Sequence, residues 1–166
     1  GGAIQLAALE SAMGIGMVAG GVILGVWGGF RRRAMTMMCG LVVLGVGTLG
    51  VGLAPAGWFP LAVGGMLLMG AMLPIVNGSA FALVQTVVPA GMQGRVLTLM
   101  MSLSMVVAPL GLAAAGPLAD VVGVQTWYLA AGVLMVGVAA LGLSVPDVVH
   151  MEKRGEAYVA GLQAAE

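Results

Sequence analysis

Charged side chains are scarce in this 166-residue sequence, and their scarcity decides its class. Asp, Glu, Lys and Arg together make up 7% of the chain, whereas soluble domains carry about 25% charge. Hydrophobic residues make up 61%, and the mean hydropathy is +1.13. With a net charge of zero and six basic residues, the chain lacks the basic surface that binds nucleic acids or acidic substrates. The composition predicts an integral membrane protein.

Cysteine and histidine are also nearly absent. The single cysteine, Cys39, lies in an apolar stretch, which argues against a disulfide framework and a thiolate metal site. His150 has no second ligand at helical spacing, so no metal site is expected there. The sequence has no Ser/His/Asp set, no phosphate-binding loop followed by Lys, and no histidine pair for haem. We therefore expect neither an enzyme nor a bound cofactor or metal.

What the sequence has instead is five long apolar runs. They predict transmembrane helices over residues 4–30, 34–53, 59–88, 96–118 and 127–145. The third run contains no charged side chain, and at about 1.5 Å rise per residue it exceeds the roughly 30 Å hydrocarbon core of a bilayer. The 14 methionines are scattered through every span and indicate flexible packing. The predicted architecture is an all-α membrane bundle over residues 1–146, followed by a cytoplasmic tail over residues 147–166.

The third span carries two amide side chains in an otherwise apolar run. Pro74 and Gly78 are expected to bend or loosen it near mid-membrane, where irregular backbone is tolerated only against protein or water. Asn77, Phe81 and Gln85 follow at intervals of four residues and share one face. We interpret this face as the wall of a solute path. An interhelical hydrogen bond, worth about 0.6 kcal/mol in membranes, is an equal alternative for Asn77 and the favoured one for Gln85.

The first and fourth spans are expected to flank that path. In the first, Gly16 with Gly20, Gly21 with Gly25, and Gly25 with Gly29 form overlapping small-xxx-small patterns, which let a neighbouring helix approach closely. In the fourth, an inward-looking face is predicted from polar and helix-bending residues, namely Ser102, Pro109 and Gly116, with Pro117 beside them. The second and fifth spans have few polar residues and are predicted to lie outermost, against lipid.

Glu10 is the only acidic residue near the membrane before Asp120. Acidic side chains inside a membrane are candidates for carrying protons, which makes Glu10 the candidate for proton coupling. Arg31 follows 21 residues later, about 31 Å along a helix, and this places Glu10 near the outer interface. An interfacial position without a coupling role is therefore the favoured alternative.

All six basic residues fall on the same side once five spans are crossed. They are Arg31, Arg32, Arg33, Arg95, Lys153 and Arg154. By the positive-inside rule this side is cytoplasmic, so we interpret the arginines mainly as determinants of topology. We expect a multi-pass protein of the cell membrane with its amino end outside and its carboxyl end in the cytoplasm. The start at Gly1-Gly2 and the odd number of spans indicate a fragment that follows upstream helices.

Four segments carry a family resemblance when they are taken together. They are Gly25-Val-Trp-Gly-Gly-Phe-Arg-Arg-Arg33, Pro74-Ile-Val-Asn-Gly78, Val88-Pro-Ala-Gly-Met-Gln-Gly-Arg-Val96, and Ala108-Pro-Leu-Gly111 with Gly116-Pro-Leu-Ala-Asp120. In this order they resemble the carboxyl half of major facilitator superfamily transporters, in the branch of macrolide-efflux proteins and enterobactin exporters. The resemblance implies that the five spans are helices 8–12 of a twelve-helix fold, with helices 7, 8, 10 and 11 around a central cavity. The sequence departs from the family at Gly29, where an acidic residue is frequent, and at Gly116-Pro117, which lacks the full glycine set of the antiporter motif.

The resemblance also implies a function. It implies secondary active, proton-coupled efflux of a small amphipathic solute of the drug, macrolide or siderophore type, by an antiporter that works through alternating access. The implied partners are the lipid bilayer, the solute and a missing amino-terminal half, in a transporter that is monomeric at full length. Two alternatives stay open. One is a non-transporting helical membrane subunit that docks a partner, and the other is an importer of the same superfamily.

Overall fold

The structure is a computed structural model that describes residues 2–30, 33–55 and 58–145. It contains the helices α1 (Gly2–Trp27), α2 (Arg33–Leu53), α3 (Phe59–Val87), α4 (Ala90–Val122) and α5 (Val124–Ser144). Each is long and apolar enough to cross a membrane, and the described residues form no β-strand. The prediction of an all-α membrane protein with five spans is confirmed. The expected tail, residues 147–166, lies outside the described residues, as do Arg31 and Arg32.

The helices begin and end close to the predicted spans, except for α4. This helix begins at Ala90 and continues to Val122, so Asp120 lies in its last turn and not in a loop. A helix can extend beyond the hydrocarbon core, because its backbone hydrogen bonds are made within the segment in any surroundings. The limits of the spans within the bilayer therefore stay predictions.

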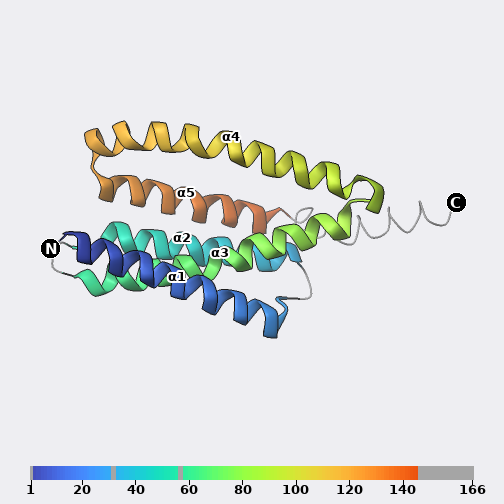
Figure 1. The fold of residues 1–166 in the computed structure, drawn as a ribbon, viewed down its shortest axis with the longest axis horizontal. Coiled ribbons are helices and arrows are strands. Elements are labelled where there is room, and N and C mark those ends of the chain that lie inside the picture. The colour runs from blue at the N-terminus through green and yellow to red at the C-terminus, as the bar shows by residue number, and fades with distance from the viewer. Residues whose placement is uncertain (1, 31–32, 56–57, 146–166) are drawn as a thin grey trace, which may run out of the picture.

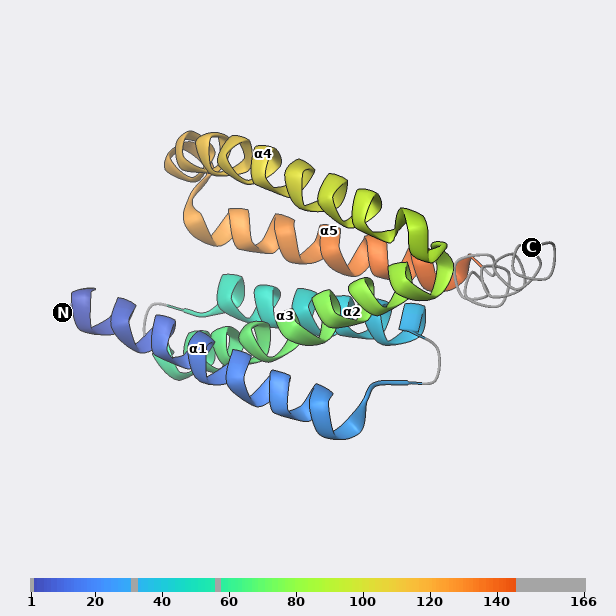
Figure 2. The same cartoon turned by 45° about the vertical axis from the view of Figure 1, so that its right-hand side comes forward.

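α2 packs between two other helices. It contacts α3 on one side and α5 on the other, α1 packs against α3 alone, and α4 contacts only α3 and α5. Figures 1 and 2 show α4 running beside α5 and standing apart from the group of α1, α2 and α3. Of the five helices, α2 has the largest buried share and α4 the smallest.

Glycine lets α1 and α3 touch through their backbones. A Cβ on Gly16 would meet the carbonyl oxygen of Leu67, and a Cβ on Gly20 would meet the carbonyl group of Ala71. Only residues without a side chain permit this approach. In a membrane, where lipid is as apolar as the helices, such close packing is a main source of helix association.

Of the small-xxx-small patterns predicted for α1, the one that meets α3 is therefore Gly16 with Gly20, and the patterns of Gly21 and Gly25 have no partner among the described residues. Gly21 and Gly25 are exposed, and no other helix has an atom within 4 Å of where their Cβ would lie. Successive residues of an α-helix are about 100° apart, so the step from Gly20 to Gly21 turns away from α3. The small-xxx-small spacing occurs on both faces, and the spacing alone does not say which face meets a neighbour.

The prediction that residues 34–53 lie outermost is also wrong within this bundle. A Cβ on Gly45 would lie 3.2 Å from the carbonyl oxygen of Gly132 on α5, and a Cβ on Gly47 would lie 3.1 Å from that of Gly65 on α3. Thr48, the next residue after Gly47, is buried and donates its hydroxyl to the carbonyl oxygen of Leu44 at 2.9 Å. Glycines on two faces of α2 admit two neighbours, which a ranking of spans by polarity does not detect. α5 keeps a wide exposed surface, as expected, with only Gly132 and one alanine buried.

Prolines do not end the helices that contain them. α3 continues through Pro74, and α4 continues through Pro109 and Pro117. Gly78 leaves room for α1, because a Cβ there would lie 2.7 Å from Leu24 Cδ2. Gly116 has no neighbouring helix within 4 Å of a Cβ position, so its predicted packing role has no partner among the described residues.

α4 is connected to its neighbours by very short links. Val88 and Pro89 join it to α3, and Gly123, with a φ of 88°, joins it to α5. Wherever the burial of α4 is described, none of its residues is buried. The helix is therefore held by its ends more than by its sides.

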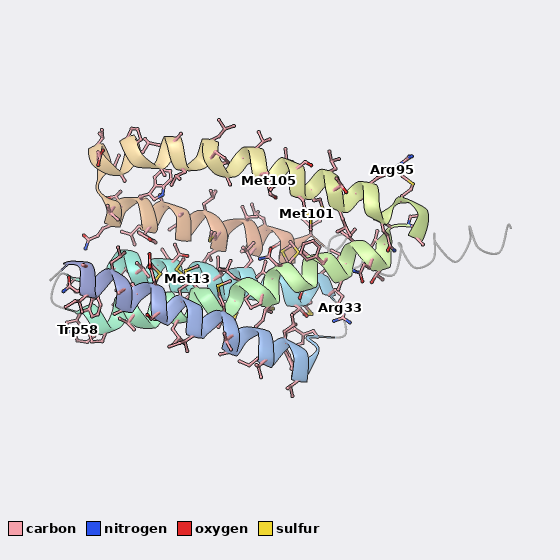
Figure 3. All side chains as sticks on the ribbon, in the orientation of Figure 1. Met13, Arg33, Trp58, Arg95, Met101 and Met105 are labelled. Atoms are coloured by element: carbon pink, nitrogen blue, oxygen red, sulfur yellow. The ribbon has the colours of Figure 1, made fainter. Side chains whose placement is uncertain are left out.

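The described arginines gather at one end of the bundle. Figure 3 shows Arg33 and Arg95 at the end where α1 and α3 finish, and Trp58 at the opposite end. The described arginines thus share one end of the bundle, as the charge pattern predicts, and Trp58 lies at the other. Which end faces the cytoplasm stays a prediction.

Candidate functional site

A pocket of about 580 Å³ lies between α3 and α4. Small-molecule sites measure about 300–1,000 Å³, so a drug-sized solute fits such a space. Figure 3 shows Met101 and Met105 pointing from α4 toward α3. This space, named here the α3–α4 pocket, is lined by Asn77, Ala80, Phe81, Met100, Met101, Ser104 and Met105.

The α3 wall of the pocket includes two of the residues predicted for a solute path. Asn77 and Phe81 are one helical turn apart and project from the same side of α3. Phe81 supplies an aromatic face that is 37% exposed. The two residues share one face of α3, and this face lies opposite α4. Their role in a solute path stays a prediction.

Asn77 carries the only free hydrogen-bond donor in the pocket. Its amide forms no hydrogen bond with any described residue. The hydroxyl of Ser104, the other polar side chain, donates to the carbonyl oxygen of Met100 at 2.9 Å. An amide in apolar surroundings is costly until it finds a partner. The pocket thus offers one amide within an uncharged wall.

Methionine supplies most of the α4 wall. The thioether side chains of Met100, Met101 and Met105 are exposed toward the open space. Methionine is flexible and polarizable, and its sulfur makes contacts with aromatic rings worth about 0.3–1.5 kcal/mol. This wall can adapt to solutes of different shape. The sequence contains a signal for this wall, because Met100 and Met101 are followed about one helical turn later by Met105. An interpretation of all methionines as packing residues misses this signal.

Two other residues predicted for the solute path lie elsewhere. Gln85 is exposed two turns beyond Asn77 and does not line the pocket. Ser102 follows Met101 by one residue, and the turn of about 100° carries it away from α3. It lies instead in an open hollow of about 590 Å³ along α4, whose other lining residues are Gly91, Gly94, Arg95, Thr98 and Leu99.

Ionisable side chains take no part in the α3–α4 pocket. Glu10 is exposed on α1 and is not among the residues that line it. Within the described ranges, no three His, Cys, Asp or Glu side chains gather closely enough to hold a metal ion. Cys39 is a free, half-buried thiol of α2. A proton-coupling role for Glu10 stays a prediction.

The residues that follow α1 have a defined geometry. Gly28 and Gly29 have φ values of 72° and 80°, which favour glycine and end α1. The backbone N–H of Phe30 donates to Thr36 Oγ1 at 2.8 Å, and Arg33 Nη1 donates to the carbonyl oxygen of Gly28 at 2.7 Å. Arg33 therefore stabilises the end of α1 through a hydrogen bond, and it also contributes positive charge at this end of the bundle.

Comparison with curated proteins finds efflux proteins among the relatives. Over 136 residues the chain is 29% identical to macrolide efflux protein A of Streptococcus pyogenes, covering 82% of this chain and 34% of that protein. Over 139 residues it is 34% identical to multidrug efflux pump Tap of Mycolicibacterium fortuitum, covering 80% and 32%. Over 109 residues it is 28% identical to macrolide efflux protein A of Enterococcus faecalis, covering 66% and 34%. The chain spans about a third of the length of these relatives.

Two further comparisons give no match. No family model matches the sequence. No solved structure matches it. The relationship therefore rests on the curated relatives, together with five apolar helices of membrane-spanning length.

Proposed function

We propose that this chain, which is similar to a macrolide efflux protein and a multidrug efflux pump, forms part of a secondary transporter of the major facilitator type that exports a small amphipathic solute. The chain is a multi-pass membrane protein by its five apolar helices. The observation that supports the proposal most directly is the α3–α4 pocket, where the unpaired Asn77 amide faces a wall of methionines. Such a pocket combines adaptable apolar contact with one polar anchor.

The chemistry of the pocket limits the solute. No charged side chain lines it, and a buried charge without a partner is very costly. The part of the solute that enters the pocket is therefore uncharged, mostly apolar, and able to exchange a hydrogen bond with Asn77. Burial of each solute methylene contributes about 0.8 kcal/mol. Recognition then depends on several weak contacts, which suits a macrolide or a drug of similar character.

We extend the proposal to the mechanism of transport. Alternating access requires two repeats that rock against each other around a site between them. This chain spans about a third of its relatives, and in the proposed transporter the remaining length supplies the amino-terminal half. A proton gradient supplies the energy, and Glu10 is the candidate on this chain for carrying the proton. The basic end, with Arg33 and Arg95, faces the cytoplasm.

Solute accumulation in cells tests the function. Cells that express the longer transporter containing this chain are loaded with a fluorescent macrolide and, separately, with an uncharged apolar dye. Expression is expected to lower the accumulation of both, and a protonophore is expected to restore it. Unchanged accumulation would refute export of these solutes. Lower accumulation that persists with the protonophore would refute proton coupling alone.

Asn77→Ala tests the pocket within the same assay. The substitution removes the amide and keeps an apolar wall, so the expected result is a several-fold rise in KM for the macrolide. Gln85→Ala removes an amide on the same helix outside the pocket and serves as the matched control. Equal effects of the two substitutions would contradict the role of the α3–α4 pocket.

A further inference from the structure

Gln93 joins the end of α3 to the start of α4. Its side-chain Nε2 donates hydrogen bonds to the carbonyl oxygens of Gln85 and Val88, each at 2.9 Å. Gln93 lies in the first turn of α4, Gln85 lies in the last turn of α3, and Val88 is the residue that follows α3. In the part of the chain that the structure describes, no other side chain forms a hydrogen bond between these two helices.

The carbonyl group of Gln85, at the end of α3, needs a donor from outside its own helix. The last carbonyl groups of an α-helix have no partner within it, and a nearby side chain can supply one. The link between the helices consists of Val88 and Pro89, and a proline has no backbone N–H to donate. Gln93 supplies the donor, and its double hydrogen bond fixes the angle at which the chain turns from α3 into α4.

Few other contacts hold α4 in place relative to α3. The helix has no buried residue wherever its burial is described, and its contacts with α3 and α5 are sparse. Met101 follows Gln93 by about two helical turns, or about 12 Å along the axis. Over that length, a rotation of about 10° at Gln93 moves Met101 by about 2 Å. A small change at the junction therefore changes the width of the pocket.

We propose that Gln93 is a positioning residue that holds the two walls of the α3–α4 pocket at the spacing that solute binding requires. This rests on the proposed function, because it takes the pocket as the solute site. Without the two hydrogen bonds, α4 samples a wider range of tilts. The correct pocket width is then populated for a smaller fraction of the time, and the apparent dissociation constant for the solute rises in proportion.

Spin labels measure the tilt directly. The longer transporter carries Cys39→Ala together with Val18→Cys on α1 and Leu103→Cys on α4, two sites that are 70% and 62% exposed. Pulsed electron spin resonance then gives the distribution of distances between the labels in lipid nanodiscs. The parent is expected to show a narrow distribution, and Gln93→Ala is expected to show a wider one.

Two charged substitutions test whether the hydrogen bonds of Gln93, and not the size of its side chain, hold the tilt of α4. Gln93→Glu keeps the shape of the side chain and removes its donors, so it is expected to widen the distribution as Gln93→Ala does. Gln93→Arg keeps N–H donors with sufficient reach and is expected to preserve the narrow distribution. If Gln93→Ala does not fold, this pair decides, and equal distributions for the Glu and Arg variants would overturn the proposal.

A matched glutamine controls for the loss of a surface hydrogen bond. Gln125 Nε2 on α5 donates to the carbonyl oxygen of Ala54 at 3.1 Å, and this contact does not join α3 to α4. Gln125→Ala is expected to leave the distance distribution unchanged. A widening as large as that of Gln93→Ala would overturn the specific role of Gln93.

Binding of a fluorescent macrolide links the tilt to the pocket. Gln93→Glu is expected to raise the Kd several-fold and to leave the maximal transport rate nearly unchanged, whereas a purely structural defect lowers the amount of active protein at constant Kd. Equally narrow distance distributions for the parent and Gln93→Ala would overturn the proposal. A wider distribution with an unchanged Kd would overturn its connection to solute binding. Absence of macrolide binding by the parent would instead refute the proposed function and leave the distance result valid.

Discussion

Gly20 of α1 lies directly against the carbonyl group of Ala71 on α3, with no room for a side chain between them. Gly21, the next residue, has no neighbouring atom within 4 Å of a Cβ position. Both residues are glycines within the same helix, so they share the same intrinsic helix propensity. Any difference between substitutions at the two positions therefore reports on the packing of α1 against α3.

Gly20→Val is expected to lower the stability of the bundle, and Gly21→Val is expected to have little effect. The added side chain at Gly20 overlaps the backbone of Ala71, and overpacking of this kind costs about 1–3 kcal/mol or more. Thermal unfolding of the detergent-solubilised transporter, followed by size-exclusion chromatography, measures the difference. Equal unfolding temperatures for the two variants would contradict the described contact.

Gly28→Ala is expected to destabilise the turn between α1 and α2. The φ of 72° at Gly28 costs a residue with a Cβ about 1–2 kcal/mol. Gly25→Ala provides the control, because Gly25 lies within helical backbone with open space around it. The same thermal assay applies, and a Gly25→Ala protein less stable than Gly28→Ala would show that the turn geometry is wrong.

Met101→Trp is expected to reduce macrolide binding by filling the α3–α4 pocket. A loss of about tenfold in affinity corresponds to about 1.4 kcal/mol. Leu110→Trp places the same bulk on α4 at a site that is 64% exposed and does not line the pocket. Equilibrium binding of a fluorescent macrolide distinguishes the two variants. Retained affinity in Met101→Trp would show that the macrolide binds elsewhere.

The orientation in the membrane is expected to place Arg95 in the cytoplasm and Trp58 outside. In a Cys39→Ala background, a membrane-impermeant maleimide should label Trp58→Cys in intact cells and Arg95→Cys only after permeabilisation. The reverse pattern would contradict the positive-inside orientation. Labelling of both sites from the same side would contradict their positions at opposite ends of the bundle.

The sequence predicts the number and type of helices because membrane spans need long apolar runs, which are read directly from composition. It does not predict which helix lies centrally. α2 has few polar residues and so resembles a lipid-facing helix, yet Gly45 and Gly47 admit neighbours on two sides. In a membrane, burial follows from small residues and close backbone approach more than from polarity, and the sequence does not state which glycine meets which partner.

Only the α3 wall of the candidate site can be predicted from the sequence. The spacing of Asn77 and Phe81 places them on one face of α3 whatever the rest of the fold does. The opposite wall depends on how α4 is rotated, and Met101 and Ser102 are adjacent in sequence but face different spaces. Helical periodicity defines the faces of a helix, whereas the rotation of α4 about its axis decides which face meets α3, and the sequence does not state this rotation.

The contacts of α2, α3, α4 and α5 close a ring, in which each helix touches two others. Two of its four joints, on either side of α2, are locked by glycine against backbone, and the two that involve α4 are sparse. Because α4 has few contacts and the helices on either side of α2 are in close glycine contact, a change in the tilt of α4 alters the α3–α4 pocket without separating α2 from α3 or α5.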